Sequence, residues 1–325
     1  MTRLAMMFLP LLAGGCSANA QSFDPHDPHS PLHIARTIVL PNVKGRIDHM
    51  ALDRKGNHLF VAEYGNGSLD EIDLARGKVV GSIRGLHEPQ GVAWLAKQNE
   101  LAVASGDGLV TFYRGNDRKP VAVVRLGDDA DNVRIDSRNG DLVVGYGSGA
   151  LAVIDPDKHE VVRQMKLPAH PEAFELFGAK VFVNVPDAHK IAVGDLDQGR
   201  VTALLSTGPR LGNYPMASDP AGSRFAVGYR VPGTVSIMDA KSGELQTSAS
   251  ICGDADDLYF RSSQWIAVCG SGAVELIDSA DTRRRVSVTT RRGSRTGLLD
   301  VIGDRLFLAV PASAGPAAIW ELSFR

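Results

Sequence analysis

The chain has 325 residues, and its 35 Lys and Arg against 37 Asp and Glu give a formal net charge of −2. A hydrophobic content of 44% is typical of a globular protein and excludes a disordered chain. The near-neutral balance argues against a general nucleic-acid binder, which would be basic, so no nucleic-acid partner is expected.

Residues 1–20 have the pattern of a signal peptide. A basic residue precedes the apolar run LAMMFLPLLA (4–13), which is too short to span a bilayer, and Ala18-Asn19-Ala20 matches a signal-peptidase site. In an alternative interpretation, AGGC at residues 13–16 is a lipobox, and a lipid on Cys16 would anchor the protein to the bacterial outer membrane. Both interpretations place the protein outside the cytoplasm. In the first it is periplasmic or secreted, and in the second the lipid is its only attachment to the membrane.

The next segment, QSFDPHDPHSPL at residues 21–32, is polar and rich in proline. This composition predicts a flexible linker between the leader and the folded part of the chain.

A repeat of about 41 residues organises residues 33–325. Seven segments align: RIDHMALD, HEPQGVAW, DADNVRID, AHPEAFEL, GNYPMASD, DADDLYFR and SRTGLLD. One aligned column holds His49, Gln90, Asn132, Glu172, Pro215, Asp257 and Thr296, at steps of 39 to 43 residues. Alternating apolar residues within each copy predict four short strands, which is typical of a propeller blade.

The two ends of the repeat array complement each other. The seventh copy supplies three strands, and HIARTIVL (33–40) precedes the first copy and resembles a fourth strand. Pairing these segments would close the ring and remove an open sheet edge. The sequence therefore predicts one all-β domain, a seven-bladed β-propeller with four-stranded antiparallel blades, whose last blade is closed by the N-terminal strand. We expect a monomer.

The segment LFVAEYGNGSLDEIDLARGKVV (59–80) resembles the YVTN-type repeats of YncE-like bacterial periplasmic propellers. The resemblance covers nearly the whole mature chain and implies an extracytoplasmic seven-bladed propeller. It implies no enzymatic activity, because a fold alone does not determine a function.

The loops of such a ring fall on two faces. Turns after first and third strands, such as DRKGN and DPAGS, have ordinary turn chemistry. The other face, which we call the channel face, is formed by loops before first strands and after second strands, and these loops collect His, Arg, Tyr and acidic residues. We expect a small molecule or an envelope protein to bind there. The candidate ligand-binding residues are His49, Glu88, Gln90, Asn132, Arg134, His170, Glu172, Asn213, Tyr214, Asp257 and Arg295.

Two further interpretations concern the same face. Asp131 and Asp256, in GDDAD and GDADD three blades apart, are candidate ligands for Ca²⁺ or another divalent metal. A metal-assisted, lactonase-like hydrolase or lyase could use His49, His170 or Glu172 as a base. A nucleophile motif such as GxSxG is absent from the sequence, so a non-enzymatic binding protein is the leading interpretation. Alternatively, the polar groups form only a structural plug, and arginines or protons balance the acids.

Cys252 precedes the first predicted strand of blade six, and Cys269 ends its second strand. Antiparallel pairing places both near the channel face. In an oxidising compartment they could form a disulfide, and otherwise they are two buried thiols.

Overall fold

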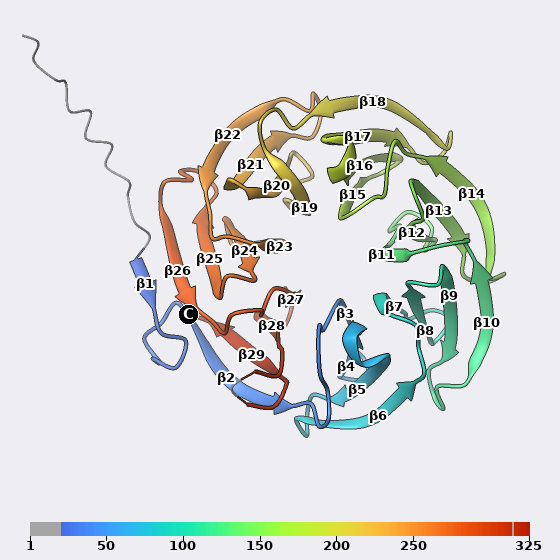
Figure 1. Ribbon diagram of the computed structural model, residues 1–325, viewed down its shortest axis with the longest axis horizontal. Coiled ribbons are helices and arrows are strands. Elements are labelled where there is room, and N and C mark those ends of the chain that lie inside the picture. Colours follow the sequence, from blue (N-terminus) through green and yellow to red (C-terminus); the bar gives the residue numbers. More distant parts are fainter. Residues whose placement is uncertain (1–20, 314) are drawn as a thin grey trace, which may run out of the picture.

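The computed structural model describes residues 21–313 and 315–325, and this part folds into a ring of seven sheets around a common axis (Figure 1). Each sheet contains a blade of four antiparallel strands, which are consecutive in the chain except in the last blade, so the predicted seven-bladed β-propeller is confirmed. The expected signal peptide, and Cys16 with its lipobox, lie outside the described residues. No helix in the described part is long and apolar enough to cross a membrane.

The first strand of every blade lies nearest the axis and the fourth lies at the rim (Figure 1). Blades one to three consist of β3 (Met50–Asp53), β4 (His58–Glu63), β5 (Ser68–Asp73), β6 (Lys78–Arg84), β7 (Pro89–Leu95), β8 (Glu100–Ser105), β9 (Leu109–Arg114), β10 (Pro120–Arg125), β11 (Ala130–Ile135), β12 (Leu142–Tyr146), β13 (Ala150–Asp155) and β14 (Glu160–Lys166). Blades four and five consist of β15 (Phe174–Phe177), β16 (Lys180–Val185), β17 (Lys190–Asp195), β18 (Arg200–Ser206), β19 (Leu211–Ser218), β20 (Arg224–Val231), β21 (Gly233–Asp239) and β22 (Leu245–Ser250). Blades six and seven contain β23 (Ala255–Arg261), β24 (Gln264–Cys269), β25 (Ala273–Asp278), β26 (Arg285–Thr289), β27 (Gly297–Asp300), β28 (Arg305–Val310), β29 (Ala318–Phe324) and β2 (Leu32–Val39). Two short 3₁₀ turns, η1 (Tyr64–Asn66) and η2 (Pro186–Ala188), follow second strands.

Position within a blade explains the composition of each strand. In β4, HLFVAE, every residue after the first is buried, because the second strand is covered on both faces by neighbouring blades. In β6, KVVGSIR, exposed and half-buried residues alternate, because the fourth strand has one face toward solvent. The core therefore consists of apolar contacts between neighbouring blades around the ring. The polar residues lie mainly in the loops and along the central axis.

The N-terminal strand completes the last blade as predicted. β2 pairs with β29 from Leu32↔Phe324 to Val39↔Ala318, in antiparallel register. An ion pair of 2.6 Å between Arg36 and Glu321 crosses the same junction. This pairing joins β2 and the last strand of the chain, β29, within one sheet and closes the ring.

The structure differs from the linker expected over residues 21–32. Strand β1 (Gln21–Phe23) pairs in parallel with β26 and adds a fifth strand to blade six (Figure 1). Phe23 packs against the apolar cluster shared by blades six and seven, and the His26 ring meets Trp320 edge-on at 6.0 Å. Backbone pairing with the outer edge of β26 and these aromatic contacts hold the segment that begins at Gln21 against the ring.

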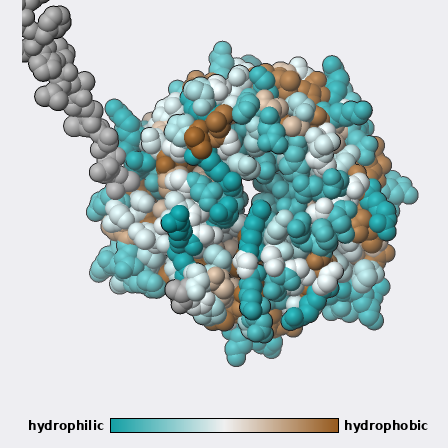
Figure 2. Space-filling view, in the orientation of Figure 1, coloured by the Kyte–Doolittle hydropathy of each residue, from teal (hydrophilic) through white to brown (hydrophobic). Residues whose placement is uncertain are grey.

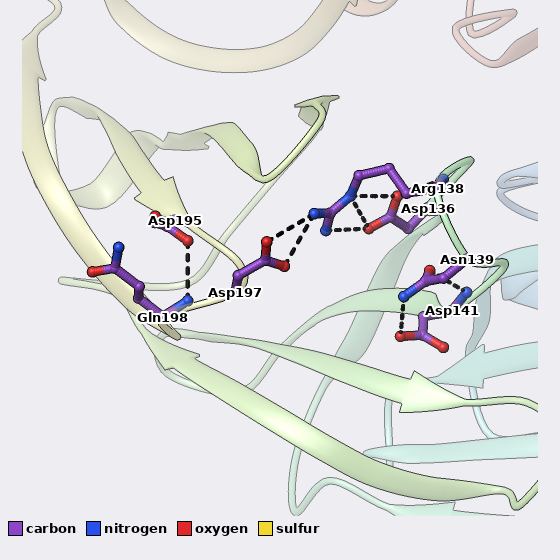
Figure 3. Close-up of polar contacts among 7 residues, drawn as sticks. All are labelled: Asp136, Arg138, Asn139, Asp141, Asp195, Asp197 and Gln198. Carbon is purple, nitrogen blue, oxygen red and sulfur yellow. Dashed lines mark hydrogen bonds and ion pairs between the residues drawn. The ribbon is translucent and has the colours of Figure 1, made fainter.

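The face opposite the channel face contains ordinary turns, as predicted. Arg138, between β11 and β12, pairs with Asp136 of its own blade at 2.6 Å and with Asp197 of blade four at 3.0 Å (Figure 3). Asp195 accepts a hydrogen bond of 3.0 Å from the backbone N–H of Gln198. These side chains satisfy turn backbones and tie neighbouring blades together.

Candidate functional site

Three connected spaces follow the axis from the channel face inward. The outermost, which we call the cup, is a cavity of about 560 Å³. It is lined by Arg46, Tyr64, Glu88, Gln90, Gly106, Asp128, Asp129, Asp131, His170, Glu172, Tyr214, Arg230, Asp256 and Arg295. The next, the throat, has about 30 Å³ and is lined by Arg46, Asp48, His49, Asp131, Asn132, Glu172, Ala173, Tyr214, Asp256, Asp257 and Thr296. Figure 2 shows one face of the ring, where mostly hydrophilic side chains surround the central hollow.

The third space, the well, opens toward the opposite face. It has about 520 Å³, and the inner strands line it, with apolar side chains that include Trp94, Leu258 and Val301. Along the axis, the cup is therefore lined by polar residues, the throat by acidic residues, and the well largely by apolar residues.

Interruptions of the strand register place several of the polar side chains at the cup and throat. In β7, β11, β19 and β23 the pairing with the second strand shifts near the channel face. The residues at these shifts include Gln90, Asp131, Asn132, Tyr214 and Asp256. A β-bulge redirects its side chains, so these residues face the axis instead of a neighbouring blade.

Gly91 makes one of these bulges possible. A Cβ atom on Gly91 would lie 1.9 Å from the carbonyl oxygen of Asp131. Only glycine therefore lets β7 approach β11 closely enough to place Gln90 and Asp131 in the same cavity.

Arginines neutralise part of the acidic wall of the cup. Arg230 pairs with Asp254 at 3.1 Å and also with Asp256, and Arg295 reaches Asp254 at 2.8 Å. The Arg230 guanidinium lies 3.8 Å from the centre of the Tyr214 ring. These cation–π and ionic contacts join blades five, six and seven around the cup.

The opposite wall of the cup is held by contacts of blades one to four. Gln90 donates a hydrogen bond of 2.9 Å to Asp129, and the His170 Nδ1 atom lies 2.7 Å from the Gly147 carbonyl oxygen. His170 also lies 3.6 Å from an Asp129 oxygen. Arg46 pairs with Asp48 at 2.7 Å and lies 5.0 Å from the centre of the Tyr64 ring.

Burial raises the pKa of the throat carboxyls. It brings the pKa of Glu172 to about 8, with the Asp256 charge as the next cause. Burial and the neighbouring Asp48 charge raise the pKa of Asp131 well above its usual range. Asp257 accepts a hydrogen bond of 2.7 Å from the Gly297 backbone N–H, but burial still raises its pKa to about 7. The throat therefore favours protonated carboxyls or a neutralising cation.

Burial acts on His49 in the opposite direction. It lowers the pKa of the imidazole to about 4, and the positive charges of Arg134 and Arg46 add to the effect. His49 lies 3.7 Å from Asp131, but a neutral imidazole does not balance that carboxylate.

Most of the predicted residues meet at the cup and throat, and two do not. Those that meet are His49, Glu88, Gln90, Asp131, Asn132, His170, Glu172, Tyr214, Asp256, Asp257 and Arg295. Arg134 lines the well, 4.0 Å from Glu175. Asn213 is fully buried and donates hydrogen bonds to Asn184 and to the Lys190 carbonyl, so it supports the loop backbone.

Arg46 and Arg230 were not among the predicted binding residues. Arg46 lines both the cup and the throat. Its position two residues before Asp48, within the first aligned segment, was the signal available in the sequence.

The two cysteines of blade six form a disulfide, with 5.9 Å between the Cα atoms of Cys252 and Cys269. The proposed metal ligands Asp131 and Asp256 both line the throat. Within residues 21–313 and 315–325, His, Cys, Asp and Glu side chains form no group of three or more that could hold a metal ion.

Comparison with known proteins adds no family to this description. No family model matches the chain, and no curated protein sequence matches it.

Proposed function

We propose that the chain is an exported, YncE-like propeller that binds a small ligand in the cup. The observation that carries this proposal is that all seven blades contribute to one concave cavity of about 560 Å³. This volume lies within the range of small-molecule sites, and the convergence of a few polar groups on such a cavity is their usual feature. A structural plug alone would need no open space above the throat.

The disulfide supports export. Cys252 and Cys269 are joined at the channel-face end of blade six, and such bonds persist in oxidising compartments such as the periplasm. Mass spectrometry of the mature protein tests this part of the proposal. A chain beginning at Gln21 indicates signal-peptide cleavage, a lipid on Cys16 indicates an anchored form, and an unprocessed chain contradicts export.

A variant that fills the cup tests ligand binding. Gly106 lines the cup, and a Cβ there would first meet the mobile end of Glu88, at 2.8 Å. The next contact is the Glu88 Cβ at 3.1 Å, so Gly106→Leu should occupy the cavity with a shift of a few tenths of an ångström at Glu88. Gly253→Leu is the matched control, because Gly253 does not line the cup and a Cβ there would meet nothing nearer than 3.9 Å, at Ser271.

Native mass spectrometry and thermal shifts can compare these proteins against a panel of amines, amino acids, carboxylates and sugars. We expect at least one compound to bind and stabilise the wild type and the Gly253→Leu variant but not the Gly106→Leu variant. A panel without any binder, or equal binding by both variants, would contradict a ligand site in the cup.

A further inference from the structure

Three buried oxygen atoms of throat residues have no hydrogen-bond partner, and one of them, Oδ2 of Asp48, is ion-paired with Arg46 at 2.7 Å instead. The other two have no arginine partner. They are Oδ1 of Asp131, a residue 6% exposed, and Oδ1 of Asn132, a residue 3% exposed. Both residues line the throat, and Asp131 also lines the cup. A buried acceptor without a donor is costly, so these atoms call for a ligand that supplies N–H or O–H groups.

The charge of the cavity indicates the sign of that ligand. Eight carboxyl groups and three guanidinium groups line the cup and throat together. The three arginines are already paired, Arg46 with Asp48, and Arg230 and Arg295 with Asp254 or Asp256. None of these ion pairs includes Asp131 or Glu172. The cavity therefore lacks positive charge at the point where the unpartnered oxygens lie.

The geometry favours an organic cation over a metal ion. The described residues contain no group of three or more potential metal ligands. The walls instead already accommodate guanidinium groups, since Arg230 lies over Tyr214 at 3.8 Å and Arg46 over Tyr64 at 5.0 Å. Aromatic faces next to carboxylates are a general arrangement for binding organic cations.

We propose that the cup binds a small organic cation whose ammonium or guanidinium N–H groups enter the throat and donate hydrogen bonds to Asp131 and Asn132. This inference rests on the proposed function of the cup as a ligand site. A flexible amine can pass the rim, place one charged end in the throat of about 30 Å³ and leave the remainder in the cup.

Isothermal titration calorimetry at pH 8 tests the proposal with three probes. Spermidine and agmatine carry ammonium or guanidinium donors, whereas tetramethylammonium carries a positive charge without N–H groups. We expect spermidine or agmatine to bind at least about tenfold more tightly than tetramethylammonium, because hydrogen bonds between charged groups supply this difference. Equal binding of all three would overturn the role of the unpartnered oxygens.

Asp131→Asn locates the site, because at nearly constant volume it removes the negative charge and replaces one acceptor oxygen with an N–H donor group. We expect it to weaken binding of the amine by about tenfold or more. Asp157→Asn is the matched control, because Asp157 is an exposed acid paired with Lys97 on the opposite face, and it removes the same charge. If Asp131→Asn fails to fold, Glu172→Gln replaces it. Equal affinities in the throat and control variants would overturn the proposal.

Glutamate and glucose distinguish this inference from the proposed function. If either binds the wild type and is excluded by Gly106→Leu while the amines do not bind, the cup is a ligand site but its cationic specificity is refuted. If no amine, glutamate or glucose binds, the cationic inference fails. Binding of the other compounds in the panel of amino acids, carboxylates and sugars then tests whether the cup is a ligand site at all.

Discussion

Glu172 should make the stability of this propeller fall as the pH rises. Burial lifts its pKa from 4.5 to about 8 in the folded protein. Between these values the folded state keeps a proton that the unfolded chain releases, so the free energy of unfolding decreases with pH across this window. At about 1.4 kcal/mol per pH unit, the ionised Glu172 costs about 5 kcal/mol once the pH exceeds 8.

Glu172→Gln removes this ionisation and keeps the shape and polarity of the side chain. We expect the variant and the wild type to differ by less than about 1 kcal/mol at pH 4.5, where Glu172 is protonated in the folded state. At pH 9 the variant should be more stable by several kcal/mol, up to about 5. Other throat carboxyls, including Asp257, also titrate, so the difference between the two proteins reports Glu172 together with its coupling to the neighbouring Asp256 and Asp48.

Urea unfolding at half-unit steps from pH 4.5 to pH 9 measures this difference. Glu160→Gln is the control, because Glu160 lies exposed on the outer strand β14. A wild type and Glu172→Gln pair whose unfolding free energies stay parallel across the range would refute the reasoning. The same result would show that the Glu172 carboxyl remains hydrated in the folded protein.

Three other changes test the packing around the site. Gly91→Ala should cost about 2 kcal/mol or more in urea unfolding, since its Cβ would meet the Asp131 carbonyl at 1.9 Å; unchanged stability would show that β7 can move away freely. Replacing Cys252 and Cys269 together by serine removes a cross-link with a sequence separation of 17 and should cost about 3 kcal/mol. Adding a reductant should then lower the melting temperature of the wild type but not of this double variant. Arg138→Ala should cost about 1 kcal/mol or less, because Arg138 is 34% exposed, and a loss that persists in high salt would indicate packing instead of an ion pair.

The fold was predictable because its signals are local and repeated. The aligned column from His49 to Thr296 lies within about four residues of the start of each inner strand, and alternation within each copy marks the strands. Strand β1 was missed because three residues carry no periodicity, and its pairing with β26 depends on contacts distant in sequence. Phe23, an apolar residue in a polar segment, was the one local sign of docking.

The site was only partly predictable because bulges decide where its side chains lie. Asp131 and Asn132 lie at the register shift of β11 and face the throat, whereas Arg134 lies beyond it, where pairing with β12 has resumed, and lines the well. The ion pairs of Arg230 depend on the relative placement of blades five and six. Neither a bulge nor a contact between blades follows from strand alternation alone.

The β2–β29 pairing also determines the order in which the protein can be assembled. The two partners stand at opposite ends of the propeller sequence, so a chain emerging from a ribosome or a membrane channel can stack its early blades but cannot complete the last sheet. Bringing these distant strands together is the most entropically demanding contact in the ring. The cup takes side chains from every blade, and its last contributor, Arg295, directly precedes β27 of the blade that this pairing completes.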